Sequence, residues 1–507
     1  MTRRRIDGPL WTLLGAIGVI LITRLIILLT NLGRFDGDEG VTGVMAQRIL
    51  DGHFPIFFGI QSYQGALEQY FQAGVLALLP DTYFTLRLVQ LALVVIICVL
   101  VYVLGTKAIG SRWGGALAAV LYAVGPYYSV WKGVRTHGGY DTATIFGLLV
   151  ILLALWLRRE SARAPWIAGL IGLCAGLAIW ANYLSVFLLI PGALWALGSA
   201  RGYLKRLIPP AVGGFVLGIL PIIIFRLQNG LNPPSGTGTP PATTFGDRVG
   251  NLLNPVTGQF LGPGSVPAEI SRWFIPALAV IIALGVLGAA VWTRRWGIWD
   301  VITLRTARRA PIDIVLIGFL ITPILYGLSS YTWFTGEPRY LFTLYPFLAV
   351  GVAAAVFALR GRARATIAAL VVALSTILLG WTMTSIQSAG GFLPTIAEGP
   401  IYSENLPAVA DALEQRGVKS VYADYWLSYP LQFAGYSRFS VTPYEHSHFP
   451  DIDAQVADDP RPGIVAVTAA GAQATRDNLR AKGRTFKEAE VAGYTIFWNV
   501  APARRTG

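Results

Sequence analysis

Phe35-Asp36-Gly37-Asp38-Glu39-Gly40 carries three carboxylates in four positions, just beyond an apolar segment that runs from Leu10 to Thr30. That segment is long enough to cross a bilayer core of roughly 30 Å. An ionised carboxylate held beside hydrocarbon costs several kcal/mol unless a cation or a metal compensates it. We therefore interpret this cluster as the active site.

The composition shows that lipid surrounds most of the chain. Of 507 residues, 54% are hydrophobic and 13% charged, and the mean hydropathy is +0.56, whereas soluble domains carry about 25% charged residues. Eleven apolar segments begin near Leu10, Thr82, Arg112, Tyr140, Pro165, Tyr183, Leu207, Ser271, Pro311, Tyr340 and Ala365. We therefore expect a polytopic α-helical membrane protein with about 11 transmembrane helices.

The basic residues predict an orientation. With a cytoplasmic amino terminus, the inner loops carry nineteen Lys and Arg residues and the outer loops eight, as the positive-inside rule requires. The carboxylates of Asp36, Asp38 and Glu39 then lie outside. The first apolar segment exceeds a signal h-region of about 7 to 15 residues and lacks a small-residue cleavage site. We expect a signal anchor and a multi-pass protein of the plasma membrane.

The charge of +13 does not point to nucleic acid. Residues 1–385 hold 29 Lys and Arg against 14 Asp and Glu, while residues 386–507 hold 11 against 13. No stripe of basic residues interleaved with exposed aromatic residues supports a nucleic-acid partner. Cys98 and Cys174 lie in apolar segments, so we expect packing residues rather than a disulfide framework.

The first outer loop, residues 31–81, contains apolar residues at helical spacing, namely Val41, Val44, Met45 and Ile49. We expect a helix lying on the membrane surface there, and a re-entrant or interfacial helix over Gly65 to Pro80. A second outer loop, Arg226 to Glu269, is rich in Pro, Gly and Thr, which favours a lid or a linker equally.

The composition changes after Met383, which predicts two domains: a membrane domain of residues 1–385 and an extracytoplasmic α/β domain of residues 386–507. The expected elements of the second domain are a helix over Pro407 to Arg416, a strand over Val418 to Ala423, a strand over Ile464 to Val467, a helix over Ala472 to Ala481 and a strand over Val491 to Trp498. Glu445-His446-Ser447-His448 lacks metal-ligand spacing, so we interpret both histidines as surface residues.

Each candidate site residue also has a structural interpretation. Asp and Glu favour helix N-termini, which accounts for one of the carboxylates before a helix that begins near Gly40. Arg87 lies a few residues inside an apolar segment, where it either extends to the interface or binds a phosphate. Arg24 is a weaker candidate, since it can pair inside the bundle.

Two further outer segments carry charge. Lys132, Arg135, His137 and Asp141 follow one another closely, and a solvated loop explains them as well as a site does. Glu337-Pro-Arg339-Tyr340 opens a later apolar segment. An exposed ion pair there contributes little stability, but the expected topology puts it on the same side as Asp38.

Several motifs, taken in order, resemble the GT-C membrane glycosyltransferases. They are Asp38-Glu39 before a helix, Gln61-Ser-Tyr-Gln-Gly65-Ala-Leu-Glu68-Gln-Tyr70, and Leu86-Arg87-Leu at the start of an apolar segment. Arg339-Tyr-Leu-Phe-Thr-Leu-Tyr-Pro346 is similar to the Arg-Tyr-Leu-x-x-x-x-Pro signature of the family 39 type branch, which holds the protein O-mannosyltransferases and the lipid A aminoarabinose transferases. The resemblance covers about residues 10 to 385. Asp36 departs from the family pattern and leaves open which aspartate is catalytic, although Asp38 matches best.

The resemblance implies an inverting transfer of a sugar from a polyprenyl-phosphate carrier to a hydroxyl of a glycan, lipid or protein acceptor at the outer face. Asp38 would act as general base, and Glu39 would orient Asp38 or the acceptor. Arg87 would stabilise the departing phosphate with Lys132, Arg135 or Arg339. The substrate-binding candidates are Asp36, Glu68, Arg87, Lys132, Arg135, His137, Glu337, Arg339 and Tyr340. A divalent cation bridging Asp38 and the phosphate is compatible with the resemblance, since some relatives use one.

Two other functions stay open. A transporter or flippase of lipid-linked sugars would place ionisable residues near the membrane midplane and show two related halves; here the carboxylates lie in outer loops and no internal repeat is visible. A non-catalytic membrane scaffold would leave Asp36, Asp38, Glu39 and Arg87 unexplained. The sequence specifies neither the sugar, the acceptor nor the oligomeric state.

Overall fold

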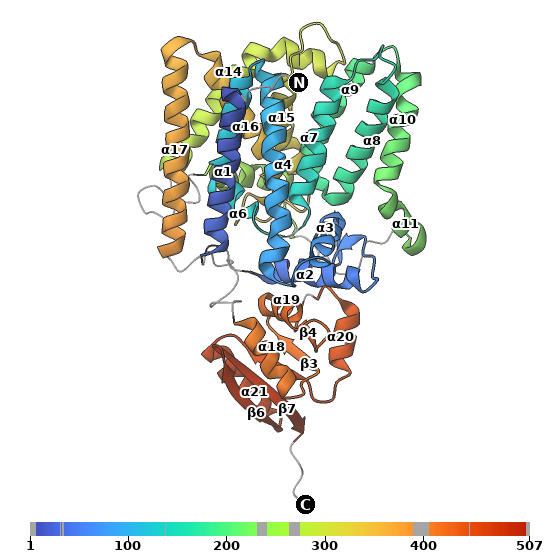
Figure 1. Ribbon diagram of the computed structural model, residues 1–507, viewed down its shortest axis with the longest axis vertical. Coiled ribbons are helices and arrows are strands. Elements are labelled where there is room, and N and C mark those ends of the chain that lie inside the picture. Colours follow the sequence, from blue (N-terminus) through green and yellow to red (C-terminus); the bar gives the residue numbers. More distant parts are fainter. Residues whose placement is uncertain are drawn as a thin grey trace, which may run out of the picture.

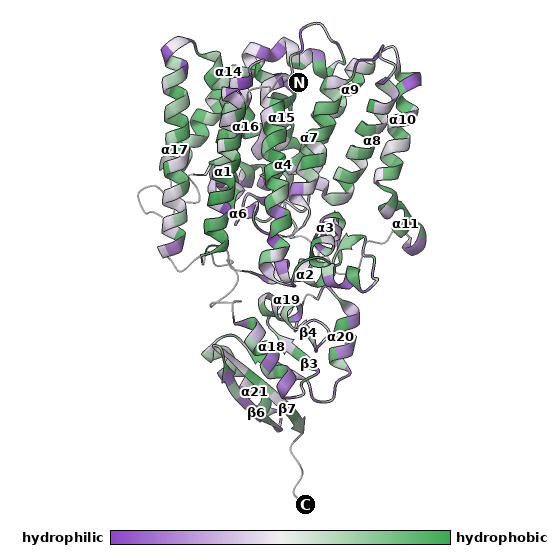
Figure 2. Ribbon diagram, in the orientation of Figure 1, coloured by the Kyte–Doolittle hydropathy of each residue, from purple (hydrophilic) through white to green (hydrophobic). Residues whose placement is uncertain are grey.

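The computed structural model describes residues 7–30, 32, 35–136, 138–230, 241–262, 274–388, 405–445 and 447–502. Long helices stand side by side in the upper part of Figure 1, and two short helices, α2 (Gly37–Leu50) and α3 (Leu67–Leu76), lie across their lower end. A smaller part with a β-sheet follows below α2 (Figure 1). The helical array is predominantly apolar along its length, as Figure 2 shows.

Each apolar segment expected from the sequence contains a helix. The helices of this part, besides α2 and α3, are α1 (Gly8–Leu28), α4 (Tyr83–Ile109), α5 (Arg112–Ala123), α6 (Tyr127–Lys132), α7 (Tyr140–Trp156), α8 (Ala164–Ala181), α9 (Val186–Ala200), α10 (Leu204–Gly218), α11 (Leu220–Asn229), α12 (Phe245–Asn251), α13 (Thr257–Leu261), α14 (Phe274–Ile302), α15 (Ile312–Leu328), α16 (Tyr345–Ala358) and α17 (Gly361–Ser388). A short hairpin of β1 (Phe57–Phe58) and β2 (Gln61–Gly65) precedes α3.

The structure confirms the class of polytopic α-helical membrane protein. Within the described residues, seven helices are long and apolar enough to cross a membrane, and the pair α10 and α11, bent by 62°, would make an eighth. The helices α7 and α15 are apolar but shorter, and α5 has only 12 residues. The expected number of about 11 membrane crossings stays a prediction, as does the orientation of the chain in the membrane.

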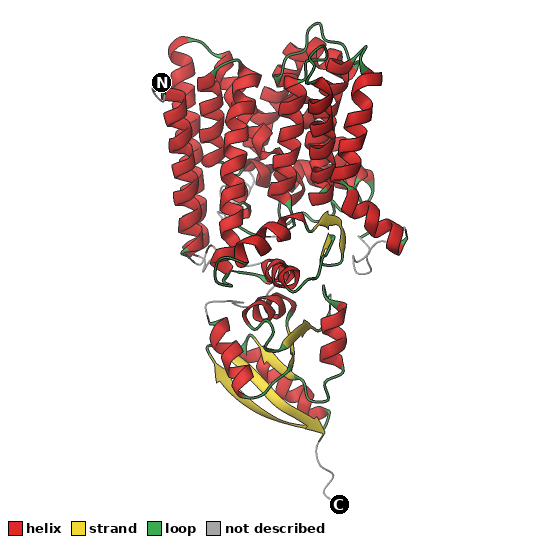
Figure 3. Ribbon diagram, turned by 45° about the vertical axis from the view of Figure 1, so that its right-hand side comes forward, coloured by secondary structure: helices red, strands yellow, loops and turns green. Residues whose placement is uncertain are grey.

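The carboxyl-terminal part is an α/β unit with a five-stranded sheet in the order β4-β3-β5-β7-β6 (Figure 3). Its strands are β3 (Ser420–Ala423), β4 (Ser440–Pro443), β5 (Gly463–Ala466), β6 (Arg484–Val491) and β7 (Tyr494–Pro502), and its helices are α18 (Leu406–Gln415), α19 (Tyr425–Ala434), α20 (Pro450–Ala457) and α21 (Ala469–Ala481). Strand β3 pairs in parallel with β4 and β5, whereas β7 runs antiparallel to β5 and β6.

Five of these elements match the expected ones, and α19, β4, α20 and β6 were not foreseen. Helix α19 has the sequence Tyr-Trp-Leu-Ser-Tyr-Pro-Leu-Gln-Phe-Ala, with Pro430 inside it. Aromatic residues and an internal proline hide a helical period. In the second outer loop, residues 241–262 are partly helical, while the Pro-rich residues 231–240 lie outside the described residues.

Helix α2 does not lie free on a membrane surface, which corrects the expectation from the sequence. Three glycines, Gly37, Gly40 and Gly43, face α19, and a Cβ added at Gly40 would lie 2.4 Å from the nitrogen of Pro430. The apolar residues of α2 share one buried cluster with residues of α3 and α4 and with Tyr429 and Phe433 of α19. The helix is therefore enclosed between the two parts of the chain, and its glycines permit the close approach.

We expect Gly40→Ala to lower the free energy of unfolding by about 1–3 kcal/mol, because the new methyl group overpacks the contact with α19. Thermal unfolding in detergent measures this loss. The matched control is Gly74→Ala in α3, where an added Cβ meets no heavy atom within 4 Å and alanine improves helix propensity by about 1 kcal/mol. Equal melting temperatures for the two variants would contradict this packing.

Candidate active site

Asp36 stabilises the amino terminus of α2. It is the N-cap of α2, and its Oδ1 accepts a hydrogen bond of 3.1 Å from the backbone N–H of Glu39. Its other carboxylate oxygen pairs with the guanidinium of Arg135, which itself stacks over the ring of Trp131 at 4.3 Å. Asp36 is thus occupied by a structural role, as expected for an aspartate at an N-cap.

Glu39 and Arg87 form a fully buried ion pair. Arg87 donates from Nε to Oε1 at 2.8 Å and from Nη2 to Oε2 at 2.6 Å. The backbone N–H of Thr136 donates to Oε1 at 3.1 Å, and Arg135 Nε lies 3.6 Å from Oε2. The pair joins α2 to α4, and the bidentate geometry compensates the desolvation of both charges.

Asp38 differs from its two acidic neighbours. It is half-buried, and it makes no ion pair within the described part of the chain. Its Oδ1 accepts a hydrogen bond of 2.9 Å from the hydroxyl of Tyr425, which belongs to the carboxyl-terminal part. Of the three carboxylates, Asp38 is therefore the one that no arginine engages within the described residues.

Basic and acidic groups from two distant segments act on one another near Asp38. Burial lowers the pKa of Lys132 to about 8, and the positive charge of Arg339 acts in the same direction. The negative charges of Glu337, Asp38 and Glu39 oppose this shift. Lys132 Nζ lies 4.7 Å from the ring centroid of Tyr140. A buried ammonium with a lowered pKa is a group whose charge an arriving anion would stabilise.

Glu337 is tied to both segments. Its Oε2 accepts a hydrogen bond of 3.1 Å from Tyr128 of α6 and lies 3.5 Å from Arg339 Nη2. Burial would raise the pKa of Glu337, but Arg339 and Lys132 outweigh burial, and the pKa lies below its ordinary value. The structure thus brings Lys132, Glu337 and Arg339 together, as the resemblance implied, with Tyr340 next in the chain.

Glu68 belongs to a second group of buried polar residues, which includes Gln90, Asp141 and Thr142. It is fully buried in α3, and the hydroxyl of Thr142 donates to its Oε2 at 3.2 Å. Burial raises the pKa of Glu68 to about 7. Gln90 of α4 donates to Asp141 at 3.0 Å and to the carbonyl of Arg135 at 3.1 Å, which links this cluster to the segment that carries Arg135.

The remaining expected residues have different outcomes. His137 lies outside the described residues. Arg24 is fully buried in α1, where its Nη1 donates to the carbonyl of Ala123 at 3.2 Å. Arg87, which the sequence allows either to extend to the interface or to bind a phosphate, directs two of its donors at Glu39. This geometry gives Arg87 a supporting role.

Sequence reasoning missed Tyr425 and His448. The hydroxyl of Tyr425 lies 3.0 Å from Nε2 of His448, and His448 is buried rather than a surface residue, which corrects our interpretation of Glu445-His446-Ser447-His448. His446 lies outside the described residues. No local sequence pattern could reveal the contact between Tyr425 and Asp38, which are 387 positions apart.

The donor set around Asp38 does not fit a metal held by several protein ligands. Among the described residues, no group of three or more His, Cys, Asp and Glu side chains could hold a metal ion. The neighbouring carboxylates of Asp36 and Glu39 are engaged by arginines. We derive no step through a metal.

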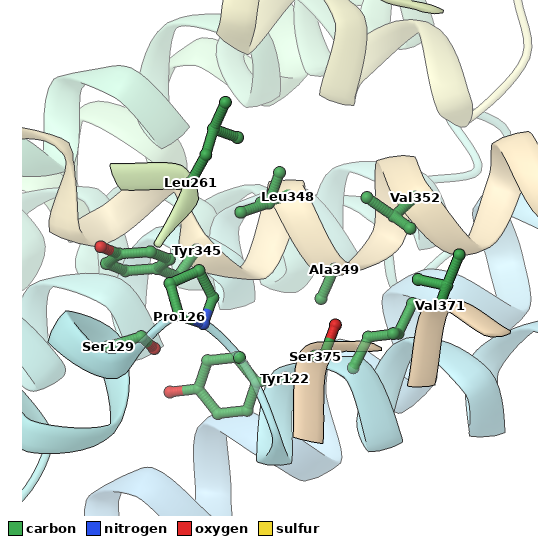
Figure 4. Close-up of a pocket in the computed structure, with 12 residues that line it drawn as sticks. Tyr122, Pro126, Ser129, Leu261, Tyr345, Leu348, Ala349, Val352, Val371 and Ser375 are labelled. Atoms are coloured by element: carbon green, nitrogen blue, oxygen red, sulfur yellow. The ribbon is translucent and has the colours of Figure 1, made fainter. Parts of the chain in front are cut away.

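An apolar cavity of about 150 Å³ opens between the helices beside α6. Figure 4 shows Leu348, Ala349 and Val352 of α16 facing Val371 and Ser375 of α17 across it. Pro126 and Ser129 close one end, and Ser129 lies one helical turn before Lys132 on α6. The cavity thus adjoins the helix that carries the buried ammonium.

Comparison with known proteins gives a partial sequence match and a match of fold over nearly the whole chain. Residues 65–225 match the family described as dolichyl-phosphate-mannose-protein mannosyltransferase. No curated protein matches the sequence.

Several solved structures resemble this one, among them two of ArnT and one of AftD. ArnT from Cupriavidus metallidurans bound to undecaprenyl phosphate is 12% identical, with a TM-score of 0.62 over 98% of this chain and 99% of that chain. Its apo state gives a TM-score of 0.59 at 12% identity, over 96% of this chain and 99% of that chain. The arabinofuranosyltransferase AftD from Mycobacteria is 13% identical, with a TM-score of 0.53 over 97% of this chain and 40% of that chain.

We expect Arg87→Met to lower the free energy of unfolding by about 3–5 kcal/mol, because it leaves the Glu39 carboxylate buried without its partner. The double variant with Glu39→Met should recover much of this loss. The matched control is Arg112→Met, which removes an exposed pair with Asp7 and should cost less than about 1 kcal/mol. Similar losses of melting temperature for Arg87→Met and Arg112→Met would contradict the assignment.

We also expect stability to depend on pH through Glu68. Its pKa is raised from 4.5 to about 7 in the folded protein, so the folded state binds more protons than the unfolded state between these values. This contribution is fully present below pH 4.5 and is lost as the pH rises through about 7. Unfolding followed across this range should show a smaller decline in Glu68→Gln than in the wild type. Parallel curves for the two proteins would contradict it.

Proposed function

The chain has the fold of the GT-C superfamily of membrane glycosyltransferases, which confirms the resemblance found in its sequence, and from this premise we propose that it transfers a sugar from a polyprenyl-phosphate carrier to an acceptor hydroxyl. The observation that carries this proposal is the position of Asp38, a half-buried carboxylate without an ion pair in the described residues, beside a group of buried cations. A base next to a site for an anion is what such a transfer requires.

The cationic side of the site suits a phosphate leaving group. Lys132 is a buried ammonium, and Arg339 lies 3.5 Å from Glu337. We propose that the donor phosphate binds Lys132 and Arg339, because charge placed in advance stabilises the charge that develops on the departing phosphate. The adjacent apolar cavity would accommodate part of the lipid chain. The ArnT structure with undecaprenyl phosphate supports a lipid-phosphate donor.

The reaction is a single displacement. The acceptor hydroxyl gives its proton to Asp38 while its oxygen forms a bond to the anomeric carbon of the sugar. The bond between that carbon and the phosphate oxygen breaks, and its electron pair stays on the phosphate. Attack from the face opposite the leaving group inverts the anomeric configuration.

The neighbours of Asp38 support it without reacting. Asp36 caps α2 and binds Arg135, while Glu39 binds Arg87, so both carboxylates are held in fixed positions by arginine partners. We propose that this arrangement keeps the first turn of α2 rigid and leaves Asp38 as the base. The acceptor, whether glycan, lipid or protein, would approach from the side of the carboxyl-terminal part, which contacts Asp38 through Tyr425. We further propose that this side is extracytoplasmic and that residues 1–385 and 386–507 act as the catalytic and the accessory domain.

We expect Asp38→Asn to lower kcat at least about 10²-fold, the lower end of the contribution of a general base. Asparagine keeps the size of the side chain and an oxygen that accepts from Tyr425, so folding and donor binding should persist. The measurement is consumption of polyprenyl-phosphate sugars, offered as a panel to the purified protein. Asp477→Asn, at an exposed carboxylate of α21, is the control and should retain full activity. Unchanged transfer in Asp38→Asn, or transport of a lipid-linked sugar that survives it, would contradict the proposal.

A further inference from the structure

We propose that Tyr425 and His448, both from the carboxyl-terminal part, are positioning residues that fix the carboxylate of Asp38 for catalysis. This inference rests on the proposed function, since it assigns a task to residues around its base. The two residues form one hydrogen-bonded chain, from Nε2 of His448 through the hydroxyl of Tyr425 to Oδ1 of Asp38, with separations of 3.0 and 2.9 Å.

The direction of this chain follows from the number of protons. An ionised carboxylate only accepts hydrogen bonds, so the single proton of the Tyr425 hydroxyl points at Asp38. Burial and the nearby charge of Asp38 raise the pKa of Tyr425 well above its ordinary value, which keeps the hydroxyl protonated. The oxygen of Tyr425 can then only accept from His448, whose Nε2 must carry a proton. The hydrogen-bonded chain therefore directs one donor at Oδ1 of Asp38 and holds that carboxylate in place.

His448 is held on several sides. Its backbone N–H donates to the hydroxyl of Tyr429 at 2.8 Å, and its ring meets that of Tyr429 edge-on with centroids 5.4 Å apart. Gly59, in the turn between β1 and β2, has a φ of +52°, and a Cβ there would lie 2.3 Å from Nδ1 of His448. The imidazole thus sits between the hairpin and α19, with little freedom to rotate.

The backbone around Tyr425 is equally fixed. An added Cβ at Gly37 would lie 3.2 Å from the carbonyl oxygen of Tyr425, and the carboxylate of Asp424 caps α19 by accepting from Trp426 N–H at 2.9 Å. Glycines of α2 thereby let α19 come close enough for a hydroxyl on one helix to reach a carboxylate on the other. The carboxyl-terminal part has a contact with the proposed base that its distance in the sequence would not suggest.

A second tyrosine provides a matched control. Tyr436 also donates its hydroxyl to an aspartate of the same region, Asp51 at the carboxyl end of α2, at 2.5 Å. Asp51 lies about 20 Å along the helix from Asp38, at 1.5 Å per residue. Both tyrosines join the two parts of the chain, but only Tyr425 touches the proposed base. A role in joining the parts predicts equal effects for the two, and a role in positioning Asp38 predicts an effect of Tyr425 alone.

The experiment compares steady-state kinetics of Tyr425→Phe and Tyr436→Phe in the purified full-length protein with the polyprenyl-phosphate sugar that the wild type consumes. We expect Tyr425→Phe to lower kcat about 10- to 100-fold, the effect of one hydrogen bond to a charged group, with the KM of the lipid donor within about threefold of wild type. Tyr436→Phe should keep kcat. A Tyr425→Phe variant with full kcat, or an equal loss in both variants, would overturn the inference.

Histidine variants test the outer link of the chain. His448→Gln keeps an N–H donor near the position of Nε2 and should retain most of kcat, whereas His448→Leu removes the donor and should lower kcat. Because His448 acts through Tyr425, the double variant with Tyr425→Phe and His448→Leu should be no slower than Tyr425→Phe alone. Loss of activity in His448→Gln equal to that in His448→Leu would overturn the assignment of His448.

Failure of the inference and failure of the proposed function have different signatures. A wild-type protein that consumes no donor overturns the function. An active wild type with a fully active Tyr425→Phe overturns only the positioning role. A thermal-stability cycle of Asp38→Ala, Tyr425→Phe and the double variant reports on the contact without activity, because each single variant removes it. We expect the double variant to lose less melting temperature than the sum of the single variants, and simple additivity would contradict the contact.

Discussion

Three carboxylates within four positions repel one another, and the site depends on how the protein resolves this repulsion. Two of them are neutralised: Glu39 by Arg87 in a fully buried bidentate pair, and Asp36 by Arg135. The positive end of the α2 dipole favours all three. The carboxylate of Asp38 differs from the other two because it accepts a hydrogen bond from a neutral donor, the hydroxyl of Tyr425. Arg87 and Arg135, which the sequence suggests as phosphate ligands, therefore bind two of the carboxylates and leave the carboxylate of Asp38 without an arginine partner in the described residues.

The site contains two kinds of cation: arginines paired with carboxylates, and a buried lysine with a lowered pKa. Arg87 and Arg135 are held by carboxylates inside the protein, whereas Lys132 is buried with a pKa lowered to about 8. A group in that condition responds to the arrival of an anion by holding its proton more firmly. The two kinds of cation come from neighbouring segments, and only their side-chain partners distinguish them.

The sequence predicts the membrane part well, because long apolar segments leave the backbone no choice but to form helices. All of the apolar segments named from the sequence contain helices, and the order of the motifs led to the fold that the similar solved structures have. It predicts less about the carboxyl-terminal part, where α19 combines aromatic residues with Pro430 and shows no helical period. It could not assign Arg87, since snorkelling, phosphate binding and a buried ion pair all use the same residue in the same place. It missed His448 because the contact with Tyr425 arises only when α19 folds onto α2.

The distance along the chain between Asp38 and Tyr425, 387 positions, has a consequence for biogenesis. A ribosome that adds about 5 to 20 residues per second needs roughly 20 to 80 s to travel from one to the other. The apolar helices from α4 to α17 are synthesised within that interval, after α1, so a nascent chain already embedded in the bilayer still lacks the hydroxyl that orients its carboxylate. The contact with Asp38 thereby forms only after the membrane helices have been made, and a chain truncated by premature termination before Tyr425 would insert into the bilayer without it.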